Sequence, residues 1–126
     1  MKKVLIVHSM HDPIAKVDIA QQLRGRFRRV LSQQGIKDLV VDSLVEDLYE
    51  TGRKVPRGYN AYLIHPKDVD HEDLRILRGE QPSSRLYALN RMVDYSSEEE
   101  QELYTHFTWG FEEEDIQKII DAIMGM

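Results

Sequence analysis

Short apolar runs alternate along the chain with longer segments in which apolar residues recur every three or four positions. The run KVLIVH, residues 3–8, is rich in β-branched residues and predicts a buried strand. Similar runs predict strands at 39–41, 61–65 and 85–90. The stretch LYTHFTW, 103–109, alternates and is rich in aromatic and β-branched residues, so we expect an edge strand there.

The segments between these runs have helical spacing. Asp12 is a typical N-cap, and Pro13 suits the first helical position because its missing N–H would have no partner there. A glycine commonly follows the last turn of a helix, so Gly35 predicts the end of this one. The apolar stripe of this helix is Ile14, Val17, Ala20, Leu23, Phe27, Val30 and Leu31. Further helices are predicted from the Ser43–Glu46 capping box to Gly52, from Asp70 to Gly79, in a short acidic turn or helix before 103, and along Ile116, Ile119, Ile120 and Ile123.

This alternation predicts an α/β fold. The 126 residues fit a single domain, 1–126, with a mainly parallel sheet of four or five strands between two helical layers. Right-handed crossovers limit the topology, and the length suits the flavodoxin-like strand order 2-1-3-4-5.

Composition narrows the function classes. The chain has no cysteine, which excludes disulfides, thiolate metal sites and a cysteine nucleophile. The apolar run after Lys2 and Lys3 is too short for a signal peptide, and no run approaches the ~20 residues of a membrane span. We therefore expect a cytoplasmic protein without a membrane segment.

Charge is distributed unevenly. Residues 1–93 carry 16 Lys and Arg against 12 Asp and Glu, whereas residues 94–126 carry one lysine against 10 acids. Two solvated faces of opposite sign explain this pattern, but the acidic segment could also dock on a basic partner or shield the basic face of the same chain. The basic stretches 24–29 and 53–57 lack free interleaved aromatic residues, so nucleic-acid binding is not expected.

Polar residues follow the first, third and fourth predicted strands. His8 ends the first strand and His65 the third, and these two strands are neighbours in the expected order. The carboxyl ends of parallel strands share one edge of the sheet, which we call the rim. The loops there also carry Ser9, His11, Asp12, Asp68, Asp70, His71, Asn90 and Arg91.

Three interpretations of the rim remain open. His8, His65, Asp68 and His71 could ligate zinc or manganese. Alternatively, Ser9, His11 and Arg91 could complete an anion site at the first helix, although the Asp12 cap already places negative charge there. The third interpretation is a polar rim that caps helices and has no chemistry.

Several nucleotide and phosphate chemistries are excluded. Ser9 lacks the GxSxG elbow, and the loop after the first strand lacks the glycines of a dinucleotide or P-loop turn and the pattern of a flavin phosphate cradle. A phosphorelay receiver would need acidic residues after the first strand and an aspartate after the third. His8 and His65 occupy those places.

The opening VLIVHSMHD, followed by a long amphipathic helix and GIKDLVVDSL, resembles the start of a TIR-like domain over about 45 residues. The matching positions are His8, Ser9 and Asp12. Family enzymes that cleave NAD use a glutamate on the helix after the third strand, near Glu72. The tryptophan and cysteine expected before it are absent, so the resemblance implies a non-catalytic interaction or nucleotide-sensing module.

The hypothesis favoured by the sequence is therefore a non-catalytic module without a cofactor. It would bind a partner protein or a small nucleotide at the rim through His8, Ser9, His11, His65 and Arg91. One alternative is a metal-dependent phosphoester or nucleotide hydrolase that uses the rim histidines. Another is a self-associating structural protein, in which the basic loop of one copy meets the acidic segment of another.

Overall fold

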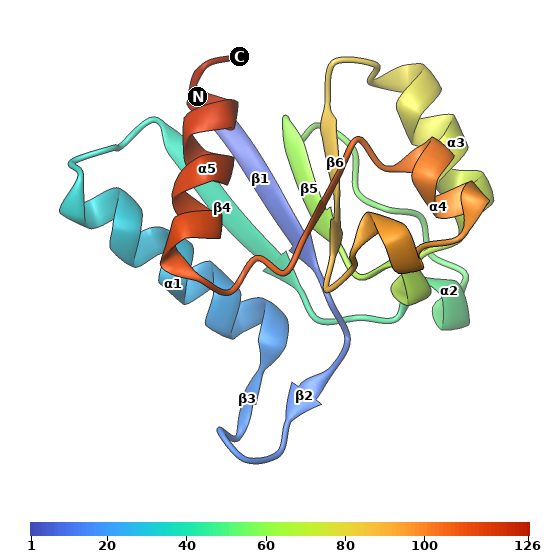
Figure 1. Ribbon diagram of the computed structural model, residues 1–126, viewed down its shortest axis with the longest axis horizontal. Coiled ribbons are helices and arrows are strands. Elements are labelled where there is room, and N and C mark those ends of the chain that lie inside the picture. The colour runs from blue at the N-terminus through green and yellow to red at the C-terminus, as the bar shows by residue number, and fades with distance from the viewer.

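A five-stranded parallel sheet lies between two layers of helices (Figure 1). The computed structural model describes all residues, 1–126. The order β4-β1-β5-β6-β7 corresponds to 2-1-3-4-5 for these five strands, which confirms the predicted fold class and topology. The strands are β1 Lys2–Val7, β4 Leu39–Leu44, β5 Ala61–Ile64, β6 Arg85–Leu89 and the short edge strand β7 His106–Thr108.

The helices divide between the two faces of the sheet, as Figure 1 shows. On one face lie α1 Ile19–Gln33 and α5 Glu113–Met124, and on the other lie α2 Leu48–Thr51, α3 His71–Glu80 and α4 Glu98–Leu103. Two 3-10 turns, η1 Pro66–Asp68 and η2 Val93–Tyr95, follow β5 and β6. None of the helices has both the length and the apolar character needed to span a membrane.

Each face of the sheet has its own hydrophobic core. Side chains alternate along a strand, so Val4 and Ile6 of β1 join the core under α1 and α5, while Leu5 and Val7 join the core under α3. The two cores contain 17 and 13 buried residues. Burial on both faces explains why β1 and β5 read as continuous apolar runs.

The segment after β1 forms a hairpin, so the predicted helix start at Asp12 and Pro13 is wrong. Strands β2 His11–Asp12 and β3 Val17–Asp18 pair antiparallel, and α1 begins only at Ile19. The Asp12 Oδ1 atom accepts the N–H groups of Ile14 and Ala15, at 2.9 and 3.2 Å, and this local turn competes with a helix. Ile14 is consequently 92% exposed instead of facing the core.

The predicted capping box is also wrong, because Ser43 lies within β4, where it pairs with Ile6 of β1. The side chain of Asp47 caps α2 instead, and Gly52 follows its last turn as predicted. Near the carboxyl terminus, Ser97 caps the short acidic helix α4, and β7 adds to the sheet edge beside β6. Both of these elements were predicted.

Candidate functional site

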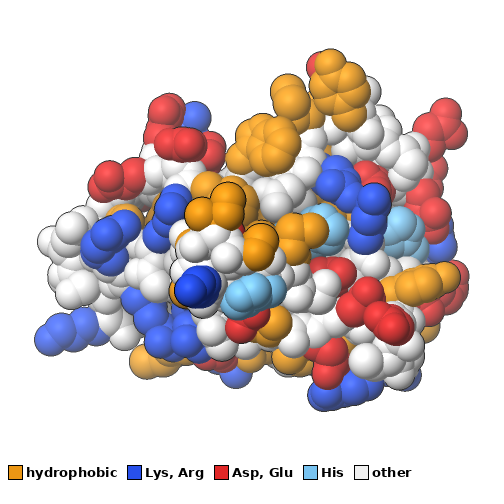
Figure 2. Space-filling view, turned by 90° about the horizontal axis from the view of Figure 1, so that it is seen from below, with side chains coloured by type: hydrophobic (Ala, Val, Ile, Leu, Met, Phe, Trp, Pro, Cys, Tyr) orange, Lys and Arg blue, Asp and Glu red, His pale blue; other side chains and the backbone are white.

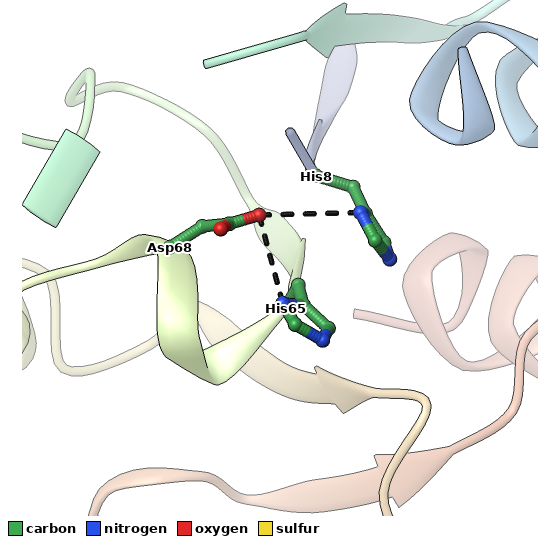
Figure 3. Close-up of side chains that lie close together, drawn as sticks. All are labelled: His8, His65 and Asp68. Atoms are coloured by element: carbon green, nitrogen blue, oxygen red, sulfur yellow. Dashed lines mark ion pairs between the residues drawn. The ribbon is translucent and has the colours of Figure 1, made fainter. Parts of the chain in front are cut away.

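Two histidine rings stack where β1 and β5 end (Figure 3). The backbone N–H of His8 donates to the Leu44 carbonyl at 3.2 Å, and that of His65 donates to the Val7 carbonyl at 2.9 Å. Both residues thus continue the hydrogen-bonded ladder of the sheet, which fixes their side chains next to each other. The ring centroids are 4.4 Å apart, with 25° between the ring planes.

The turn η1 brings Asp68 to the same place, with its carboxylate toward both rings (Figure 3). The Oδ2 atom accepts the Ser9 N–H at 2.7 Å, and Oδ1 accepts the Ser9 hydroxyl at 2.9 Å. The Nδ1 atoms of His65 and His8 lie 3.6 and 3.9 Å from Oδ2, which is longer than a hydrogen bond. We call His8, His65 and Asp68 the rim cluster.

His8 is buried and neutral. Its Nδ1 atom accepts the Met10 N–H at 3.2 Å, which places the imidazole proton on Nε2. That atom lies 3.3 Å from the Asn90 side-chain nitrogen, which is itself a donor, so the amide must be turned for its oxygen to accept the Nε2–H. Burial, followed by the neighbouring His65, lowers the pKa of His8 to about 4, although Asp68 acts in the opposite direction.

Asp68 is a buried anion. Burial alone would raise its pKa, but the attraction of His65 and the two hydrogen bonds from Ser9 outweigh burial and leave the pKa below its ordinary value. No lysine or arginine lies within ion-pair distance of this carboxylate; its only such neighbours are His8 and His65. The negative charge is therefore held by Ser9 and faces two imidazole rings.

Unpaired polar atoms are concentrated around the cluster. Four buried side-chain atoms of the protein lack a hydrogen-bond partner, and three of them are His65 Nδ1, Asn90 Oδ1 and Tyr104 Oη. Turning the Asn90 amide would give its oxygen the His8 Nε2–H as a donor. Burial, together with the negative charge of Glu100, raises the pKa of Tyr104, and the charge on Asp68 acts in the same direction.

The other predicted site residues lie outside the cluster. His11 lies in the β2–β3 hairpin, where its Nδ1 atom is 3.1 Å from the Asp18 carboxylate. His71 is the first residue of α3, and its Nδ1 atom is 3.4 Å from the carboxylate of Glu99 on α4. Three of the four predicted metal ligands therefore converge, and His71 does not. The reason is that α3 turns His71 toward α4, away from the ends of β1 and β5.

A pocket opens at the rim beyond β6. Its volume is about 490 Å³, and it is lined by Lys67, Asn90, Arg91, Met92, Tyr95, Ser97, Glu100 and Trp109. We call it the rim pocket. Arg91, a predicted ligand-binding residue, lies here, with its Nε atom 3.8 Å from Glu100. Lys67 is exposed and makes no ion pair, while Tyr95 and Trp109 are 84% and 53% exposed.

Sequence reasoning missed most of this pocket. Lys67 and Tyr95 carry no motif, whereas Trp109 lies in the acidic segment, where an exposed aromatic residue would indicate an interface. The available signal was the presence of Met92, Tyr95, Trp109 and Phe111 in the loops after the fourth and fifth strands. Such residues are typical of interfaces when they gather at one place.

Comparison with known proteins finds a clear structural likeness. No protein-family model and no curated protein sequence matches the chain. Among solved structures, a CheY-like response regulator receiver domain from Methylobacillus flagellatus aligns with a TM-score of 0.65 and 16% identity, over 98% of both chains. The response regulator protein TrrA from Thermotoga maritima, solved in complex with Mg²⁺-BeF, gives 0.59 and 12%, over 98% of this chain and 99% of TrrA.

These likenesses show the fold. Receiver domains have the flavodoxin-like architecture, so that part of the sequence resemblance is supported, whereas the TIR-like part gains no support.

Proposed function

We propose that this chain is a non-catalytic, receiver-like module that binds a partner protein at its rim. The observation that carries the proposal is the group of exposed apolar side chains there. Met10, Met92, Val93, Tyr95 and Trp109 are each between 47% and 84% exposed. Figure 2 looks onto the rim and shows hydrophobic side chains beside the projecting hairpin and again at the upper edge. Exposed apolar patches with polar borders are typical of protein–protein interfaces.

The absence of a phosphate-accepting carboxylate at the strand ends supports a non-catalytic role. A receiver that takes up phosphate would carry acidic residues after β1 and an aspartate after β5, and His8 and His65 occupy these positions. Asp68 does not replace them, because it is only 4% exposed and both of its oxygens accept hydrogen bonds from Ser9.

A metal-dependent hydrolase fits the geometry less well. A catalytic metal needs an open coordination position that substrate can reach. His8 is 1% exposed and Asp68 4%, so a phosphoester cannot approach the cluster without a rearrangement of the loops around it.

The extent of the apolar surface favours a protein over a small nucleotide. The rim pocket alone has a volume suited to a small ligand, with Lys67 available for a phosphate and Trp109 for a base. However, Met10 and Ile14, which belong to the hairpin segment and do not line the pocket, are exposed as well. A protein surface covers both regions, whereas a nucleotide covers only the pocket.

Fewer charged side chains are free for self-association through opposite charges than the sequence suggested. Arg57 of the basic loop already binds Asp73 at 2.8 Å, and Arg53 binds Glu46 at 2.7 Å. In the acidic segment, Glu99 binds Arg75 within the same chain. The uneven charges therefore partly neutralise each other inside one molecule.

Site-specific photo-crosslinking tests the proposal. A photoreactive residue replaces Tyr95 in the rim pocket or, as the matched control, Ile76, an apolar residue of α3 that is 45% exposed. We expect one protein to crosslink at position 95 and not at 76. The purified partner should then bind the wild-type chain and bind the Trp109→Ala variant at least about tenfold more weakly, because aromatic anchors dominate interfaces.

Other outcomes would overturn the proposal. Equal crosslinking at both positions would mean that the rim has no special affinity for proteins. Crosslinks only to a second copy would favour the self-associating alternative. Displacement of the crosslink by ATP, GTP or cyclic nucleotides, together with a thermal shift for one of them, would instead identify a nucleotide site.

A further inference from the structure

The rim cluster has the donor set of a metal site. One ligand atom from each of His8, His65 and Asp68 lies within 4.8 Å of the other two. We propose that these three residues bind a divalent transition metal of the zinc type, which ties the end of β1 to the end of β5. This inference is separate from the proposed function, since it concerns buried side chains and not the exposed rim pocket.

The chemistry of the donors indicates which metals fit. Two imidazole nitrogens and one carboxylate oxygen suit Zn²⁺, Co²⁺ or Fe²⁺. Magnesium, the ion present in the Thermotoga structure, prefers oxygen ligands in octahedral geometry and does not fit a site in which nitrogens outnumber oxygens. We therefore expect selection for zinc-type metals over magnesium.

Two independent features of the cluster point to a bound cation. The first is the buried carboxylate of Asp68, which lies beside no lysine or arginine, although buried charges are normally paired or coordinate metals. The second is the unpartnered Nδ1 atom of His65, which is buried and faces that carboxylate 3.6 Å away. A cation between them supplies the missing charge and the missing partner.

The two separations from Asp68 require only a small contraction, whereas the two imidazole nitrogens, which lie within 4.8 Å of each other, must turn toward a shared metal. Donor atoms on one tetrahedral zinc lie about 3.3 Å apart, as follows from bonds of ~2.0–2.1 Å. The two separations from Asp68 Oδ2, 3.6 and 3.9 Å, exceed this by a few tenths of an ångström. Asp68 Oδ2 retains a free lone pair beside the hydrogen bond from Ser9.

Metal binding at His8 has a local consequence. The only lone pair of its Nδ1 atom accepts the Met10 N–H, at 3.2 Å. A metal on this nitrogen takes the lone pair, and the Met10 N–H must turn to water. Met10 is exposed and belongs to the loop that enters the hairpin, so the change is possible without repacking the core.

The first experiment uses chelator-treated wild-type protein. We expect one equivalent of Zn²⁺ to bind by calorimetry and to raise the melting temperature by several degrees, since a ligand bound only by the folded state stabilises it. One equivalent of Co²⁺ should give the visible absorption of a tetrahedral site, and Mg²⁺ in large excess should not displace it. Failure of Zn²⁺ to bind the wild-type protein would overturn the proposal.

Variants then locate the site. We expect His65→Ala and Asp68→Asn each to weaken Zn²⁺ binding by more than about tenfold, since even residues that only orient a ligand affect affinity to that degree. His11→Ala and His71→Ala are the matched controls, because each of these histidines also faces a carboxylate outside the cluster. A loss of binding in either control with none in His65→Ala would place the metal elsewhere.

A final measurement does not depend on variant folding. In wild-type protein, Zn²⁺ should shift the backbone amide resonance of Met10 toward that of a solvent-exposed N–H and speed its exchange with water. The ring resonances of His8 and His65 should shift at the same metal concentration. Metal-induced shifts confined to His11 or His71 would overturn the assignment.

Discussion

The imidazoles of His8 and His65 stack with their centroids 4.4 Å apart, although each belongs to a different strand end. Two protonated rings at this distance would repel each other, so the arrangement favours at least one neutral imidazole. His8 is the more buried of the two and remains neutral. The pH dependence of the fold follows from this pair.

We expect His8 in chelator-treated protein to titrate with a pKa of about 4, because burial and His65 disfavour its charged form. In the unfolded chain the same imidazole binds its proton near pH 6.5. The contribution of neutral His8 to the free energy of unfolding is therefore complete above that pH and is lost as pH falls toward 4. Proton NMR of the ring measures the titration. The negative charge of Asp68 raises the pKa of His8, so Asp68→Asn should lower the pKa of His8 further. A higher pKa of His8 in this variant would contradict the assigned electrostatics.

Asp73→Asn should destabilise the protein by about 2 kcal/mol, the cost of weakening charged hydrogen bonds. The Asp73 carboxylate accepts the Val55 N–H and the Arg57 guanidinium, both at 2.8 Å. Burial would raise the pKa of Asp73, but Arg57 and Val55 outweigh it and lower the pKa. The stabilisation is therefore complete above the unfolded value of ~3.9 and is lost as pH falls through the lower folded value.

Urea denaturation at pH 7 and pH 3 measures this effect, and the Asp73→Asn penalty should shrink at the lower pH. Glu80→Gln is the matched control, because Glu80 meets the same arginine at 3.4 Å with half of its side chain exposed. It should change the free energy of unfolding by less than about 0.5 kcal/mol. A larger effect at Glu80 than at Asp73 would refute this account.

Gly110→Ala should destabilise the fold by about 2–4 kcal/mol. Gly110 has φ of +76°, which disfavours a side chain, and an added Cβ would lie 2.7 Å from Leu89 Cδ1. Thermal or urea unfolding measures the loss. Gly25→Ala, in the exposed middle of α1 with open space around it, should instead stabilise by about 0.5–1 kcal/mol. Equal effects of the two substitutions would contradict the geometry.

Lys16→Gly should stabilise the protein by up to about 1 kcal/mol. Lys16 is held in the hairpin turn at φ of +56°, a left-handed conformation that glycine adopts without strain. Lys37→Gly, at an exposed lysine without a positive φ, is the control and should not stabilise. Chemical denaturation compares the two variants, and a destabilised Lys16→Gly would show that the turn is not strained.

The sequence predicted the sheet because each central strand is buried on both faces and reads as an apolar run. The order of strands followed from chain length and right-handed crossovers, and this order places the strand that ends at His8 beside the strand that ends at His65. Asp68 joined them as predicted, since the loop after β5 is short. Convergence of the rim cluster was therefore predictable from topology.

The hairpin and the rim pocket were not predictable in the same way. Asp12 and Pro13 have helix-starting chemistry, but the same Asp12 side chain can close a turn, and sequence spacing does not decide between these outcomes. His71 has the right residue type for a metal ligand, yet the direction of α3 pairs it with Glu99. Such choices depend on tertiary contacts that a one-dimensional pattern does not contain.

The division of the interior by the sheet has a consequence for the evolution and engineering of the chain. Phe27 and Leu74 belong to the two different cores, with the backbone of the sheet between them. Destabilising effects add when sites share no contacts, so truncations at these two positions should combine without epistasis. Substitutions in one core should therefore leave the tolerance of the other core to substitution unchanged. The strand ends that carry the rim cluster should, by contrast, be affected by changes in either core.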